Sequence, residues 1–205
     1  MSGGSMRGIL MDTVVRHEQA RPGYPPGDLA IWIFILAELL VFAIFFAAYA
    51  FARSGQAELF NHYQATLNRD TALFNTLALL TSSYFVVRGV VAAREGNNAL
   101  CARWLWAAVA MGGLFLVIKA SEYADHFAAG VSLSSNTFYM FYLSLTFFHF
   151  MHVILGMVIL AAVAVKAGRD GYSPDDHTGV ETGASYWHMV DMVWLILFPL
   201  VYVMR

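Results

Sequence analysis

The chain has 205 residues, of which 59% are hydrophobic and 13% are charged, and its formal net charge is −2. A soluble domain carries roughly twice that charged fraction, so most of this chain is expected to be surrounded by lipid. The near-neutral charge, without any basic block, excludes a nucleic-acid-binding surface. The single cysteine, Cys101, excludes an internal disulfide and a multi-cysteine metal site.

Five apolar stretches are long enough to cross a bilayer, which needs about 20 residues of helix. The sequence therefore predicts an all-α integral membrane bundle of five transmembrane helices. Asp28 and Ser185 are expected to cap the first and fifth helices. Polar loops are expected between the first and second spans, at 53–70, and between the fourth and fifth, at 166–183. The predicted spans are 30–51, 72–93, 104–123, 138–165 and 186–204.

The distribution of basic residues predicts how the bundle is oriented. With the N-terminus in the cytoplasm, eight basic residues fall on the cytoplasmic side and four on the other, which places the C-terminus outside. Residues 1–28 are then an N-terminal cytoplasmic tail, and 29–205 form the transmembrane domain. The cytoplasmic set is Arg7, Arg16, Arg21, Arg88, Arg94, Arg103, Lys166 and Arg169, and the other set is Arg53, Arg69, Lys119 and Arg205.

Glu38 is the most informative residue of the first span. It lies about 12 Å along the helix from the expected cytoplasmic end, among apolar helical neighbours. A carboxyl group at that depth costs a few kcal/mol unless it contacts protein or is protonated. We therefore expect either a proton-relay or lipid-contact site or a satisfied hydrogen bond between helices.

The fourth span places His149 and His152 on one face, since residues three apart lie on the same side of a helix. Such a pair is able to bind a metal, but two histidines do not complete a site, and the Glu-x-x-His motifs of di-iron bundles are absent. Hydrogen bonding between helices is the favoured interpretation. Glu122 and His126, spaced four apart, are expected at a membrane boundary.

His188 and Asp191 are again three residues apart, at the start of the predicted fifth span. A shared network of Glu38, Asp191 and one histidine is a hypothesis that follows from their similar depth. In the second span, Asn75 and several hydroxyl residues are expected to hydrogen-bond across helix interfaces. The expected set of buried polar or lipid-contact residues is Glu38, Asn75, Glu122, His149, His152, His188 and Asp191.

Five motifs in order resemble subunit III of the haem-copper oxidase superfamily. They are WIFILAELLVFAIFF at 32–46, LFNTLALLTSS at 73–83, GGLFLVIKASEY at 112–123, TFFHFMHVILG at 146–156 and YWHMVDMVWL at 186–195. The resemblance covers nearly the whole chain from residue 27. It implies the five-helix short form, which lacks the first two helices of the seven-helix subunit. Because those two helices wall a lipid-holding cleft in the long form, this chain is not expected to build a complete cleft.

Several residues depart from the common family pattern. Lys119 stands where glutamine is frequent, and Phe147 replaces a usual glycine. Lys119, Met189 and the Tyr-x-x-Arg end are similar to the E-type subgroup encoded with nitric oxide reductases. The resemblance implies a non-catalytic accessory subunit in the bacterial cytoplasmic membrane. Its partners would be phospholipid and a catalytic subunit that holds haem together with copper or non-haem iron, and this chain would bind no cofactor.

Two alternatives remain open from the residues. The first is an independent channel or proton carrier that uses Glu38, His152 and Asp191. The second is a stand-alone metal enzyme that uses His149, His152 and Glu38. Transporters more often show broken helices at mid-membrane, whereas the only proline inside a predicted span is Pro199.

Overall fold

A computed structural model describes residues 29–204, and all five predicted transmembrane helices are present in it. The prediction of an all-α, five-span membrane protein is thereby confirmed. The tail at 1–28, with the proposed cap Asp28, and Arg205 lie outside the described residues. The helices are α2 (Leu29–Gly55), α3 (Ala57–Gln64), α4 (Arg69–Arg94), α5 (Asn98–Ala128), α6 (Thr137–Ala167) and α7 (Thr178–Phe198), followed by the π-helical segment η1 (Pro199–Val203).

Asparagine side chains begin three of the long helices. The first backbone N–H groups of a helix have no partner inside the helix, and an Asn side chain at the N-cap position supplies one. Each asparagine accepts a hydrogen bond from the backbone N–H three residues later. The pairs are Asn68 with Thr71 at 3.1 Å, Asn97 with Leu100 at 3.0 Å and Asn136 with Tyr139 at 2.9 Å.

The prediction that 53–70 is a loop is wrong, because this segment contains the short helix α3. This helix is polar overall but buries Phe60, whose ring contacts Tyr49 of α2 and Phe138 of α6 at centroid distances of 5.2 and 5.6 Å. Aromatic packing therefore stabilises a short helix that the mean hydropathy of its residues does not predict. Arg53 also reaches across the turn and donates a hydrogen bond to Asn61 at 3.0 Å.

The expected start of the fifth helix is also wrong. Helix α7 begins at Thr178, so Ser185 lies inside it, and the N-cap residue is His177 without a side-chain capping bond. The first turns of α7 are polar and contain Glu181, which accepts a hydrogen bond from Arg94 of α4 at 2.8 Å. Hydropathy indicates where the apolar part of a helix begins, and α7 begins earlier in the chain than that part.

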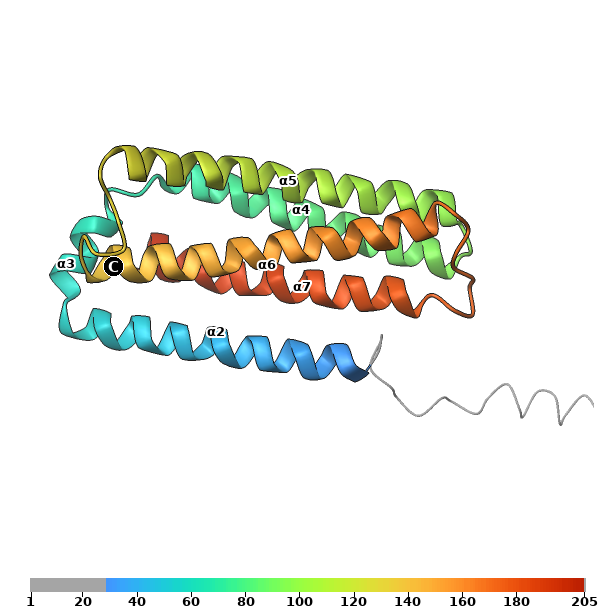
Figure 1. Cartoon of the computed structure of the whole chain (residues 1–205), viewed down its shortest axis with the longest axis horizontal. Coiled ribbons are helices and arrows are strands. Elements are labelled where there is room, and N and C mark those ends of the chain that lie inside the picture. Colours follow the sequence, from blue (N-terminus) through green and yellow to red (C-terminus); the bar gives the residue numbers. More distant parts are fainter. Residues whose placement is uncertain (1–28, 205) are drawn as a thin grey trace, which may run out of the picture.

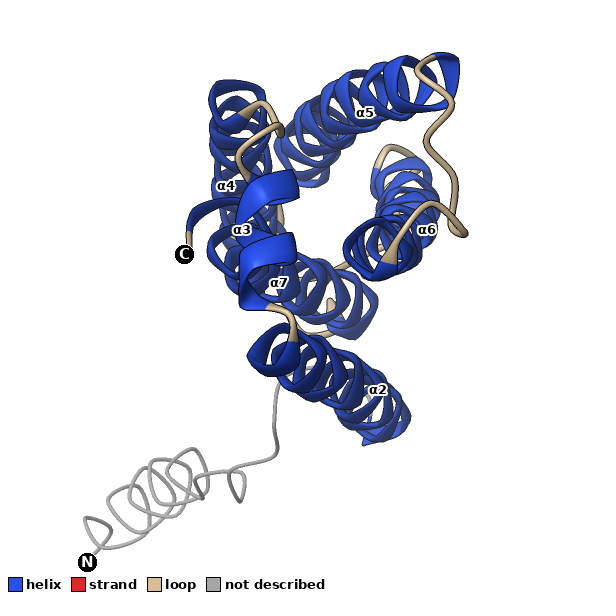
Figure 2. Cartoon of the chain, turned by 90° about the vertical axis from the view of Figure 1, so that its left-hand side faces the viewer, coloured by secondary structure: helices blue, strands red, loops and turns tan. Residues whose placement is uncertain are grey.

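Helices α4, α5, α6 and α7 form a bundle, and α2 lies along its outside (Figures 1 and 2). Helix α5 packs along α4 and α6, α7 packs along α4 and α6, and α2 contacts mainly α7. Figure 1 shows the start of α2, the α4–α5 turn and the α6–α7 loop at one end, with α3 and the C-terminal end at the other. The outer face of α2 exposes Ile33, Leu36, Leu40 and Ile44, each by 62–64%.

Close packing between helices surrounds Trp187 of α7, which is fully buried. A Cβ atom added to Gly112 of α5 or to Gly156 of α6 would lie 2.8 Å from an atom of this indole ring. Both positions therefore need glycine, because any side chain would overlap the ring. Small residues of this kind allow helix backbones to approach closely in membrane proteins.

Candidate functional site: buried polar pairs and an aromatic cage

Glu38 of α2 and His152 of α6 form a pair, with His152 Nε2 3.0 Å from Glu38 Oε2. The other ring nitrogen, Nδ1, lies 2.7 Å from the carbonyl oxygen of Phe148, so it must carry a hydrogen and donate it. Neutral His152 then accepts the proton of a neutral Glu38, and charged His152 donates to a carboxylate. A hydrogen bond between the two groups therefore needs one proton, carried either by His152 Nε2 or by Glu38 Oε2.

His188 and Asp191 of α7 lie near Ser83 of α4. His188 Nδ1 is 2.8 Å from Ser83 Oγ and 3.9 Å from an Asp191 oxygen. Asp191 is 5% exposed, and neither of its oxygens makes a hydrogen bond with the described residues. The structure therefore brings Asp191 towards His188 rather than towards Glu38. Between residues 29 and 204, no hydrogen bond or ion pair joins the Glu38 pair to Asp191.

His149 and Asn75 are fully buried at helix interfaces. His149 Nε2 lies 3.1 Å from the carbonyl oxygen of Val190, to which it donates, and its ring packs against Phe115 and Trp194. Asn75 makes no side-chain hydrogen bond with the described residues. His149 thus links α6 to α7, whereas the role expected for Asn75 stays a prediction.

Lys119 of α5 was expected among the basic residues on the non-cytoplasmic side of the membrane. Its side chain is instead fully buried inside the bundle. Its ammonium group donates hydrogen bonds to Glu122 at 3.1 Å, to Tyr142 at 3.1 Å and to Tyr202 at 2.5 Å. Both tyrosine hydroxyls also donate to Glu122 Oε1. Glu122 therefore forms an ion pair with Lys119 inside the bundle, whereas its expected position at a membrane boundary with His126 stays a prediction.

Four aromatic rings surround the Lys119 ammonium group, and we call these rings the lysine cage. The nitrogen lies between 4.9 and 5.8 Å from the ring centroids, within the range of cation–π attraction. The rings are those of Tyr123, Tyr142, Trp194 and Tyr202, so α5, α6, α7 and η1 all contribute. No sequence spacing reveals the cage, because its members are brought together only by the packing of four elements.

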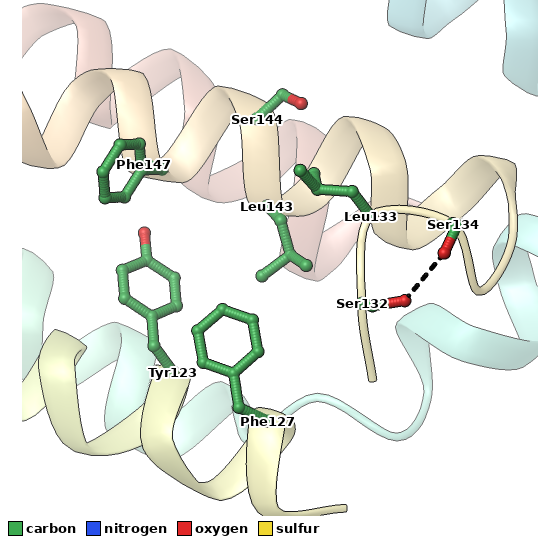
Figure 3. A pocket seen from close by; sticks show the side chains of 8 residues that line it. All are labelled: Tyr123, Phe127, Ser132, Leu133, Ser134, Leu143, Ser144 and Phe147. Atoms are coloured by element: carbon green, nitrogen blue, oxygen red, sulfur yellow. Dashed lines mark hydrogen bonds between the residues drawn. The ribbon is translucent and has the colours of Figure 1, made fainter. Parts of the chain in front are cut away.

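An apolar groove of about 590 Å³ lies beside the last turns of α5 and the first turns of α6. In Figure 3 the side chains of Tyr123, Phe127, Leu143 and Phe147 border the hollow. Ser132 and Ser134 of the α5–α6 loop lie at one side, their hydroxyls 3.0 Å apart. The groove has apolar walls and a polar end formed by the serines.

Histidine, cysteine and carboxylate side chains do not gather into a metal-binding group of three or more within residues 29–204. His149 and His152 make separate contacts, one with a carbonyl oxygen and one with Glu38. These histidines instead form hydrogen bonds between helices.

A family model described as cytochrome c oxidase subunit III matches residues 16–205. The chain belongs to the cytochrome c oxidase subunit III family. This match agrees with the five motifs that resemble subunit III of the haem-copper oxidases, and with the five-helix form of the bundle.

Curated bacterial members of the subunit III family are similar along most of their length. Cytochrome c oxidase subunit 3 of Thermostichus vulcanus is 33% identical, with 86% of each chain covered. The Synechocystis protein of the same name is 30% identical, covering 95% of this chain and 88% of its own. The probable cytochrome c oxidase subunit 3 of Mycobacterium tuberculosis is 32% identical, with 92% of each covered. Five apolar helices and these relatives identify this subunit III member as a multi-pass protein of the bacterial cytoplasmic membrane.

Proposed function

We propose that this chain is a non-catalytic accessory subunit that binds and stabilises a haem-containing catalytic subunit of a haem-copper superfamily complex. The observation that carries the proposal is the family match from residue 16 to residue 205. The relatives' names describe a subunit of an oxidase, and here the catalytic partner would hold the haem and the copper or non-haem iron. The exposed apolar face of α2 offers a surface for such a partner or for lipid.

The catalytic partner is proposed to be either a cytochrome c oxidase or a nitric oxide reductase. The names of the relatives support the oxidase. Lys119, Met189 and the Tyr-x-x-Arg end support the reductase, because they resemble the E-type subgroup. The lysine cage gives this departure a physical meaning, since a glutamine at position 119 would not bring a positive charge next to Glu122.

Purification from the native membrane in a mild detergent tests both parts of the proposal. An accessory subunit is expected to elute with a haem protein whose chains are identified by mass spectrometry. Oxygen consumption and nitric oxide consumption by the purified complex then distinguish the two partners. Elution without any haem protein would contradict the accessory role, and proton flux through the chain alone in liposomes would support a channel built on Glu38, His152 and Asp191.

Lipid holding and support of proton or substrate access are the finer parts of the same proposal. The apolar groove beside α5 and α6 is proposed to hold an acyl chain, since its lining is apolar except for serines. Ser144→Trp would fill the groove and is expected to reduce the number of lipids that stay bound in mass spectra. Ser121→Trp, at an exposed position of α5 outside the groove, is the matched control. The Glu38–His152 pair, which shares a proton, is the proposed site of proton support.

A further inference from the structure

The two halves of α2 are attached to the rest of the protein by different kinds of contact. In the C-terminal half, the fully buried ring of Tyr49 packs edge-on against Phe60 of α3 and Phe141 of α6, at centroid distances of 5.2 and 6.0 Å. In the N-terminal half, the contact with α6 is the polar pair of Glu38 and His152. Aromatic packing does not depend on protons, whereas a hydrogen bond between two titratable groups does.

The environment of His152 fixes how its ring carries hydrogen. Nδ1 lies 2.7 Å from the carbonyl oxygen of Phe148, so the opposite tautomer would place a nitrogen lone pair against that oxygen. In the neutral ring, Nε2 is therefore an acceptor that faces Glu38 at 3.0 Å. When the pair loses its last proton, this lone pair meets a carboxylate oxygen and no hydrogen lies between them.

The surroundings of the pair do not compensate for a lost proton. The His152 side chain is 10% exposed and that of Glu38 is 20% exposed. The rings of Phe42 and Phe148 lie 5.3 and 4.6 Å from the imidazole ring, so its flanks are apolar. An ionised carboxylate without a partner is costly in such a place. Loss of the proton therefore drives Glu38 away from His152.

The titratable side chains that face the pair belong to α7 and α6. They are Tyr186, which also stacks on Phe34 of α2, and His149. The Tyr186 hydroxyl makes no hydrogen bond with residues 29–204, and His149 donates to a backbone carbonyl of α7. Asp191 and His188 lie beside Ser83 of α4 instead. Neither Tyr186 nor His149 is bonded to the pair, so neither replaces the missing proton.

We propose that the Glu38–His152 pair is a proton-controlled clasp. With one proton the N-terminal half of α2 lies against α6, and release of that proton to water or to a base of the partner frees this half, while Tyr49 keeps the other half in place. The clasp is a regulation of the proposed site of proton support and rests on it. Ile33 and Leu36, exposed by 64% on the same half, move with it. Proton occupancy thereby controls the surface that α2 offers to a partner.

Distances between spin labels on the full chain in phosphatidylcholine nanodiscs test the clasp. The buried Cys101 is first replaced by alanine, so that labels attach only to introduced cysteines. Ile33→Cys with Ala110→Cys of α5 reports on the N-terminal half of α2, and Phe51→Cys with Ala110→Cys reports on its other end. All three positions are exposed, and α2 and α5 lie on opposite sides of the bundle (Figure 2).

The pH is raised from about 5 to about 9, a range in which an imidazole and a carboxyl group lose their protons. The distance between Ile33 and Ala110 should lengthen over about two pH units, as the loss of a single proton requires. The distance between Phe51 and Ala110 should stay constant.

Three variants identify the group that titrates. Glu38→Gln has an amide hydrogen that donates to His152 Nε2 and is not lost in this range, so the distance should stay short at every pH. Glu38→Ala has no partner for His152, so the distance should be long at every pH. Glu181→Gln is the matched control, because Glu181 is also a carboxylate in an ion pair, with Arg94, and this variant should behave like the wild type. Circular dichroism of each variant verifies that the helices are retained.

A wild-type distance from Ile33 to Ala110 that stays constant over the whole range would overturn the clasp. The same lengthening in Glu38→Gln would also overturn it, because another group would then be titrating. Lengthening of the distance from Phe51 would show that the whole helix leaves, against the proposal. The measurement uses the isolated chain, so purification without a haem protein would contradict the accessory role and leave the clasp standing.

Discussion

Substitution of Lys119 by methionine tests whether the lysine cage stabilises the bundle. Methionine keeps the length and the apolar stem, but it removes the three hydrogen bonds and leaves Glu122 without its ion-pair partner. Removing one member of a buried ion pair costs about 3–5 kcal/mol, because the other charge stays buried and unpaired. Glu122 keeps two tyrosine hydroxyl donors, so we expect the lower end, about 3 kcal/mol.

The assay is thermal unfolding in mild detergent, followed by circular dichroism. About 3 kcal/mol corresponds to a fall in Tm of about 6–12 °C for a protein of this size. Arg94→Met is the matched control, because it also removes one cation from an ion pair. Arg94 is 57% exposed, so its loss should cost less than about 1 kcal/mol.

A double variant separates the buried charge from other effects of the substitution. Lys119→Met with Glu122→Gln removes both charges, and we expect it to be more stable than Lys119→Met alone, because no unpaired carboxylate stays buried. The reasoning is refuted if Lys119→Met lowers the Tm no more than Arg94→Met does. It is also refuted if the double variant melts below the single one.

Two further experiments examine the helix interfaces. Gly156→Ala places a Cβ 2.8 Å from the Trp187 ring and should lower the free energy of unfolding by about 1–3 kcal/mol through overpacking. Gly113→Ala, where the nearest atom is 3.7 Å away, should lower it by less, and equal losses would argue against this packing. A double-mutant cycle of Glu38→Ala and His152→Ala should give a coupling energy of about 0.6–1.7 kcal/mol in unfolding experiments. A coupling indistinguishable from zero would show that their contact adds nothing to stability.

The five spans could be predicted from the sequence because about 20 apolar residues in a row have few alternatives to a membrane helix. The ends were less predictable, since hydropathy does not report where a helix continues into water or headgroups. Helix α5 starts at Asn98, well before the apolar stretch, because Asn97 caps it. Helix α3 was missed because Phe60 is stabilised by contacts with two other helices.

The candidate site was predictable where one helix carries the signal. His149 and His152, three residues apart on α6, are both buried, and they contact α7 and α2 respectively. Which partner each residue meets was not predictable, because the partner lies on another helix. Depth suggested a network of Glu38, Asp191 and one histidine, and the structure pairs Glu38 with His152 while Asp191 lies near His188. Lys119 was counted as a basic residue near the membrane surface, and only the packing of four elements shows it enclosed.

Trp187 seated between Gly112 and Gly156 has a mechanical consequence for the bundle. Sliding α6 by one residue along α7 would bring the side chain of Leu155 or Met157 towards the indole, so α6 and α7 keep a single register and, with α5 packed along α6, move as one body. Helix α2 contacts this body mainly through α7 and through the Glu38–His152 pair, and its glycine, Gly55, does not pack against any side chain. Any rearrangement that accompanies docking of a partner is therefore expected to be a swing of α2 against a rigid remainder, and spin labels on α2 and α5 would record it as a changed distance.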